Sequence, residues 1–136
     1  AWARERAVPV SVDLSSVATM RALGSERVRT LLVDLSPAVV FANAEEAVFL
    51  DELRVGLPAG TVFVVKRGGD PVQIRQDDDV TLVAVDRVAD VIDTTGAGDA
   101  FAAGYIVAAL RGEDPAGSAV AGCASARGAL RRPGAL

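Results

Sequence analysis

The sequence predicts an α/β fold, with a mostly parallel sheet covered by helices on both faces in a three-layer α/β/α arrangement. Short apolar segments alternate with helical segments over most of the 136 residues. Apolar residues make up 51% of the chain and charged residues 24%, which favours a packed core over disorder. Neither an internal repeat nor a low-complexity linker interrupts the sequence. We therefore expect one domain that covers residues 1–136.

The individual elements follow from apolar patterning and turn residues. In chain order we expect the end of a helix at 1–7, a strand at 8–13, helices ending at 23 and 35, a strand at 37–42, a helix at 44–54, a strand at 61–66, strands at 72–75 and 80–85, a strand ending at 92, and helices at 98–110 and 116–130.

Capping residues support most of the helices. Ser15 or Ser16 can cap the second helix, and Asn43 can cap the helix at 44–54. Asp114 followed by a proline starts the last helix. The segment 61–66 is nearly all apolar and rich in β-branched residues, which is the pattern of a central strand covered on both faces.

Composition excludes several classes of function. A net charge of −4 argues against nucleic acid and anionic membranes as partners. The chain has no histidine, which excludes a Ser-His-Asp triad and every histidine-containing zinc site. The single cysteine allows no disulfide within the chain, and no segment resembles a signal peptide or a membrane span, so a cytoplasmic location is expected.

The segment with the sequence DTTGAGDAF, residues 93–101, carries the clearest chemical signal. An apolar strand is expected to end just before it, and a helix is expected to begin within it. Gly96 and Gly98 let the backbone turn sharply, and the first N–H groups of the helix attract an anion. Asp99 in the first turn would lie beside that anion, where it can accept a proton from an attacking hydroxyl.

Other phosphate-binding motifs fit this segment less well. A Walker A loop needs a Gly-Lys-Ser or Gly-Lys-Thr ending, and a dinucleotide fingerprint needs a third glycine where Phe101 stands. From the residues alone a purely structural interpretation stays open. In that interpretation the two glycines only permit a tight turn, and Asp99 only stabilises the start of the helix.

The segment 93–104 resembles the C-terminal signature of the pfkB, or ribokinase-like, carbohydrate kinases. Three further segments resemble that family in the same order along the chain: residues 43–46 its N-x-x-E motif, residues 64–68 its strand-and-glycine element, and residues 132–135 its closing segment. The resemblance spans nearly the whole chain and implies a partial ribokinase-like fold.

The resemblance assigns roles in phosphoryl transfer. It implies that Asp99 is the general base and that Gly96, Ala97 and Gly98 form the anion hole for the transferring phosphoryl group. The cofactor would be ATP with Mg²⁺. A hydroxyl of the substrate would attack the γ-phosphorus of ATP in line.

The resemblance also assigns binding residues. It implies that Asn43 and Glu46 organise Mg²⁺ and phosphates, that Lys66 and Gly68 meet the nucleotide, and that Asp93 and Thr94 hold a monovalent cation such as K⁺. Structural interpretations stay open for three of these residues. Asn43 could be a plain helix cap, Lys66 an exposed residue at a strand end, and Asp93 a carboxylate bonded to turn amides.

Substrate and assembly are less constrained. The resemblance favours a sugar or sugar acid such as 2-keto-3-deoxygluconate. The alternatives are a nucleoside or another small alcohol, or a truncated module that binds nucleotide without catalysis. Family members are roughly twice this length, and their N-terminal half supplies the sugar contacts. We therefore expect the chain to be the C-terminal half of such a domain, able to associate with itself or with that half.

Overall fold

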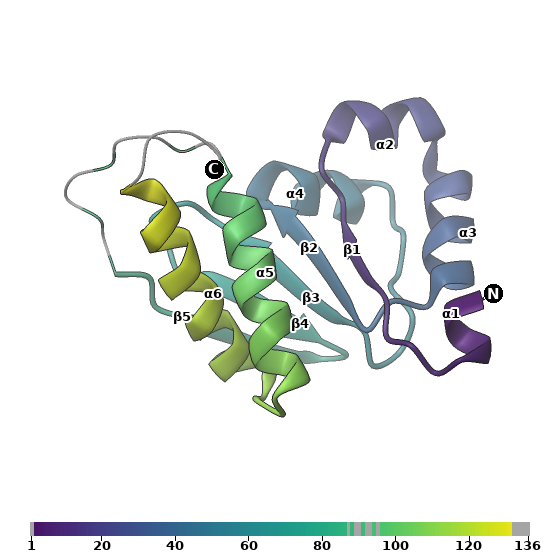
Figure 1. Cartoon of the computed structure of the whole chain (residues 1–136). Helices are drawn as coiled ribbons and strands as arrows, with labels where there is room; N and C mark the ends of the chain where they lie inside the picture. Colours follow the sequence, from purple (N-terminus) through teal and green to yellow (C-terminus); the bar gives the residue numbers. More distant parts are fainter. Residues whose placement is uncertain (1, 87, 89–90, 92–93, 95, 132–136) are drawn as a thin grey trace. The chain divides into compact units, whose positions relative to one another are not determined.

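The computed structural model describes residues 2–86, 88, 91, 94 and 96–131, and it confirms the α/β class (Figure 1). The strands are β1 (Ser11–Asp13), β2 (Val39–Asn43), β3 (Val62–Lys66), β4 (Val72–Gln76) and β5 (Asp79–Val83), in one sheet with the order β1-β2-β3-β4-β5. The helices are α1 (Trp2–Glu5), α2 (Val17–Leu23), α3 (Ser25–Leu35), α4 (Ala44–Glu52), α5 (Ala97–Leu110) and α6 (Pro115–Leu130).

Both pairings among the first three strands are parallel, as expected. β1 pairs with β2 and β2 with β3, with Asp13 opposite Phe41 and Asn43 opposite Lys66. β4 and β5 are joined by a two-residue turn at Asp77, which gives the expected hairpin and makes the sheet mixed. The strand expected to end at 92 falls largely on residues outside those described and stays a prediction.

The chain divides into two compact units, one of Ala1–Lys66 with Arg75–Val80 and the other of Arg67–Ile74 with Thr81–Leu136. In the first unit the core lies between β2 and β3 on one side and α2, α3 and α4 on the other. Its buried residues are Leu14, Met20, Val28, Leu32, Val40, Ala42, Ala47, Leu50, Val55, Phe63 and Val65. Residues of β3 are buried on both faces, which confirms the pattern expected of a central strand.

The helices of the first unit begin where capping residues predict. The Ser16 hydroxyl accepts a hydrogen bond from the backbone N–H of Thr19 and caps α2. Gly24, with φ of 78°, ends α2 and leads directly into α3, which ends at Leu35 as expected. Asn43 caps α4, so the end of β2 and the start of α4 are fixed by the same residue.

The second unit is built on the pairing of α5 with α6, which lie side by side (Figure 1). Gly104 of α5 and Gly122 of α6 allow the two backbones to come close. A Cβ added at Gly122 would lie 2.9 Å from both the ring and the carbonyl oxygen of Phe101, and one at Gly104 would lie 2.9 Å from the Ala121 carbonyl oxygen. The absence of a side chain at these two positions therefore allows α5 to pack closely against α6. α5 is the helix that begins at the glycine turn.

Tyr105, the only tyrosine, provides a pH-dependent test of this packing. It is buried on α5, and burial together with the negative charge of Asp114 raises its pKa to about 12. The folded chain favours the neutral phenol, so this contribution to stability is complete below the unfolded pKa of 10 and is lost as pH rises through about 12. Ultraviolet absorbance should show tyrosinate forming near pH 12 in the folded protein. A folded-state midpoint near pH 10 would contradict the burial.

Candidate active site

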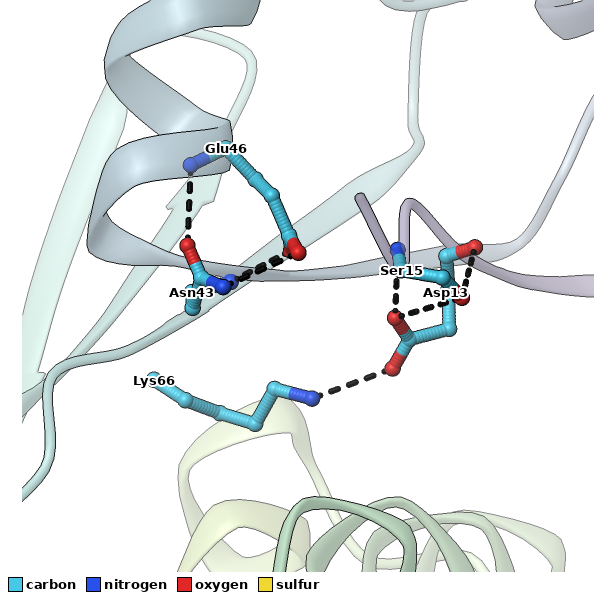
Figure 2. A network of polar contacts seen from close by, with 5 residues as sticks. All are labelled: Asp13, Ser15, Asn43, Glu46 and Lys66. Atoms are coloured by element: carbon cyan, nitrogen blue, oxygen red, sulfur yellow. Dashed lines mark hydrogen bonds and ion pairs between the residues drawn. The ribbon is translucent and has the colours of Figure 1, made fainter. Parts of the chain in front are cut away.

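Three polar side chains lie together at one edge of the sheet in the first unit. Because β1, β2 and β3 are parallel, their last residues, Asp13, Asn43 and Lys66, meet at the carboxyl edge (Figure 2). In open α/β sheets ligands bind outside the carboxyl ends of the strands. The structure thus brings together Asn43, Glu46 and Lys66, three of the residues expected to face the nucleotide and its metal ion.

Asn43 and Glu46 form a closed capping box at the start of α4 (Figure 2). The Asn43 side-chain oxygen accepts a hydrogen bond of 2.9 Å from the Glu46 backbone N–H. In return, Glu46 Oε2 accepts from the Asn43 backbone N–H at 2.8 Å and Oε1 from Asn43 Nδ2 at 2.9 Å. Glu46 is only 4% exposed, so the box holds a carboxylate away from bulk water. The structure confirms that Asn43 caps α4, and its role in binding stays a prediction.

The same geometry tests how Mg²⁺ could fit here. Both carboxylate oxygens of Glu46 already accept hydrogen bonds, so direct coordination would compete with the capping box. Mg²⁺ keeps several of its waters and takes few protein ligands when phosphates are present. Asn43 and Glu46 therefore fit a hydrated ion that they contact through water, in keeping with the organising role expected for them.

Replacing Asn43 by alanine should destabilise the chain by about 1–2 kcal/mol. The change removes a helix cap and leaves the buried Glu46 carboxylate without the side-chain amide that bonds it. Urea unfolding measures the effect. The matched control is Glu45→Gln, at an exposed position in the same first turn, which should stay within about 0.5 kcal/mol of the parent. Equal effects of the two changes would contradict a special role for the box.

Lys66 is held by an ion pair that the sequence did not reveal. Its Nζ lies 3.0 Å from Asp13 Oδ2 and 5.9 Å from the centre of the Phe41 ring. The Lys66 side chain is 20% exposed and that of Asp13 34%, so Lys66 ends its strand as expected but is half-buried rather than exposed. The sequence placed an acid and a lysine at strand ends, and parallel strands bring their ends to one edge, but only the observed strand order shows that these two residues meet.

The second unit carries the glycine turn. Gly96 lies in the left-handed region with φ of 75° and ψ of 0°, a conformation that favours glycine, and it precedes the first residue of α5. Side chains cap α2, α4 and α6, whereas α3 and α5 each begin after a glycine and have no capping side-chain bond among the described residues. The N-terminus of α5 is therefore suited to an anion from outside the chain.

Asp99 lies in the first turn of α5 and is exposed, so a bound molecule could reach its carboxylate. Gly96 and Ala97 are half-buried and Gly98 is exposed. Thr94 is exposed, and its carbonyl oxygen accepts a hydrogen bond from the Ala97 N–H at 3.3 Å.

The remaining predicted residues divide into two groups. Gly68 has φ of 64° in the turn after β3, a left-handed backbone conformation that favours glycine. Asp93 and the closing segment 132–135 lie outside the described residues.

Within the described part of the chain, no group of three acidic or cysteine side chains could hold a metal ion. No helix in that part is long and apolar enough to span a bilayer.

Comparison with known proteins identifies a family for this sequence. The sequence profile of the pfkB family carbohydrate kinases matches residues 20–136. A comparison with curated proteins gave no match.

Solved structures with a similar fold include kinases of two substrate classes. A probable sugar kinase from Rhizobium etli matches 98% of the chain with a TM-score of 0.84 and 24% identity. An adenosine kinase from Schistosoma mansoni in complex with 2-fluoroadenosine matches 97% with a TM-score of 0.83 and 23% identity. A nucleoside kinase from Burkholderia thailandensis in complex with inosine matches 98% with a TM-score of 0.81 and 21% identity. The chain spans 42%, 44% and 45% of these proteins, respectively.

Proposed function

The chain belongs to the pfkB family of carbohydrate kinases, and on that premise we propose that it carries the phosphoryl-transfer half of an ATP-dependent kinase for a sugar or sugar acid. The observation that carries the proposal is the start of α5. There, a left-handed Gly96 leads into a helix that no described side chain caps, and Asp99 lies exposed in the first turn. An anion-attracting helix end with an adjacent carboxylate is what transfer from a phosphate to a hydroxyl requires.

In the proposed reaction, the substrate oxygen attacks the γ-phosphorus of ATP as its proton passes to the Asp99 carboxylate. The new P–O bond forms while the bond to the bridging oxygen breaks, and ADP leaves. The N–H groups of Gly96, Ala97 and Gly98 would donate to the oxygens of the transferring group, where charge accumulates, and the Ala97 N–H would have to share or release its 3.3 Å bond to the Thr94 carbonyl oxygen. Such catalysis depends on positioning and on fixed dipoles, which the turn at the start of α5 can supply.

The binding residues have separate proposed roles. Lys66 and Gly68 would meet the nucleotide, Lys66 as a point charge on phosphate oxygens. Asn43 and Glu46 would orient the waters of Mg²⁺, which when bound neutralises phosphate charge. Asp93 and Thr94 would hold a monovalent cation such as K⁺.

A nucleoside is the second candidate substrate, because two of the similar structures are nucleoside-class kinases in complex with 2-fluoroadenosine and inosine. A panel of sugars, sugar acids and nucleosides, incubated with the full-length protein and ATP, separates the candidates by ADP release. Phosphorylation of a sugar or sugar acid is the expected result. Phosphorylation of nucleosides alone would favour the alternative, and nucleotide binding without any transfer would favour a non-catalytic module.

A further inference from the structure

Lys66 is paired with Asp13, so an anion that bound the lysine ammonium would come close to the Asp13 carboxylate. Lys66 ends β3 and extends its ammonium along the carboxyl edge to Asp13 (Figure 2). An ammonium group donates up to three hydrogen bonds, and within the described residues one of these goes to Asp13 Oδ2 at 3.0 Å.

The Asp13 carboxylate is itself fixed by the backbone that follows β1. Its Oδ1 accepts a hydrogen bond of 2.9 Å from the Ser15 N–H, and the Ser15 hydroxyl lies 3.3 Å from the same oxygen (Figure 2). Ser15 adopts φ of 59°, in the left-handed region that a serine seldom occupies. In this conformation the Ser15 N–H points to the Asp13 carboxylate. Asp13 is therefore a charge in a fixed place, whereas Lys66 has a flexible stem.

We propose that Asp13 is a built-in counter-ion of Lys66, which the polyphosphate of a nucleotide must displace or share. Asp13 thereby acts through Lys66 as a positioning residue that lowers phosphate affinity and favours release. This inference rests on the proposed function, because the ligand it names is the nucleotide.

The direction of the effect follows from charge. With Asp13 and Lys66 paired, this edge carries no net charge from the two residues, and a phosphate bound to the ammonium would lie near a second anion. Two like charges about 5 Å apart in partly exposed surroundings repel enough to change affinity several-fold. Asparagine at position 13 keeps the size of the side chain and the oxygen that bonds Ser15, but removes the repulsion and frees the lysine.

Calorimetric titration of the full-length protein with inorganic tripolyphosphate and with MgADP tests this inference. We expect Asp13→Asn to bind both ligands about 5- to 30-fold more tightly than the parent. Asp13→Glu, which keeps the charge, should stay within about threefold of the parent. Lys66→Met should weaken binding of both ligands.

The matched control is Asp51→Asn, which removes the acid of another ion pair in the same unit, with Arg75 at 2.9 Å. It should leave both affinities within about twofold of the parent. Equal gains from Asp13→Asn and Asp51→Asn would reveal a general charge effect and overturn the inference. So would an unchanged or weaker affinity in Asp13→Asn, an unchanged affinity in Lys66→Met, or no binding of tripolyphosphate by the parent and by Asp13→Asn. If tripolyphosphate responds as expected but MgADP binds to neither, the proposed function fails while the counter-ion role of Asp13 stands.

Discussion

Replacing Asp99 by asparagine is expected to lower turnover of the full-length protein by about 10²–10⁴-fold, while nucleotide affinity changes only a few-fold. Asparagine keeps the size of the side chain and its place in the first turn of α5, but it cannot take a proton from the substrate hydroxyl. Steady-state kinetics with the substrate found in the panel, together with titration by MgADP, separates the two effects.

The matched control for this change is Glu26→Gln. Glu26 is an exposed acid in the first turn of α3, so it shares the structural role of Asp99 without its place beside the glycine turn. Turnover in Glu26→Gln should equal that of the parent, and both variants should lose less than about 1 kcal/mol of stability from the helix dipole. Near-normal turnover in Asp99→Asn would contradict its assignment as the base.

Replacing Gly122 by alanine is the second change with a large expected effect, a loss of about 1–3 kcal/mol in the free energy of unfolding. The new methyl group would lie 2.9 Å from the ring and from the carbonyl oxygen of Phe101, both of which are buried against α6. Relief requires α5 and α6 to move apart. Because α5 begins at the glycine turn, we also expect lower turnover in the folded protein.

Gly128→Ala is the control for Gly122→Ala. Gly128 lies in the same helix, and a Cβ there would meet nothing within 4 Å. Alanine favours a helix over glycine by about 0.5–1 kcal/mol, so this change should stabilise the chain. Opposite signs for the two alanines, measured by urea unfolding, would establish the close helix contact. A stabilising Gly122→Ala would contradict it.

Local signals were enough to predict most of the fold. Helix starts at Ser16, Asn43 and Asp114 were predictable because a side-chain oxygen satisfies N–H groups only a few residues away. The all-apolar segment at β3 likewise predicted a strand buried on both faces. Such signals depend on neighbours in the chain, so they can be read without knowing the tertiary structure.

Longer-range relations could not be predicted in the same way. The pair of Asp13 with Lys66 joins residues 53 positions apart, and only the pairing of β1, β2 and β3 brings them within 3.0 Å. The close approach of Gly104 and Gly122 also depends on how α5 and α6 meet. Within the candidate site, the glycine turn and Asp99 were predictable from local sequence. Glu46 was predicted as a binding residue, but its burial in a closed capping box became evident only in the structure.

A crystal structure of the full-length protein with MgADP and tetrafluoroaluminate would show whether the start of α5 holds the transferring phosphoryl group beside Asp99. That anion mimics the phosphoryl group in the transition state of its transfer. We expect its fluorines to accept hydrogen bonds of about 2.7–3.1 Å from the N–H groups of Gly96, Ala97 and Gly98, with the Asp99 carboxylate facing the attacking position. Binding of the anion away from these N–H groups, or an Asp99 side chain turned away from it, would contradict the account.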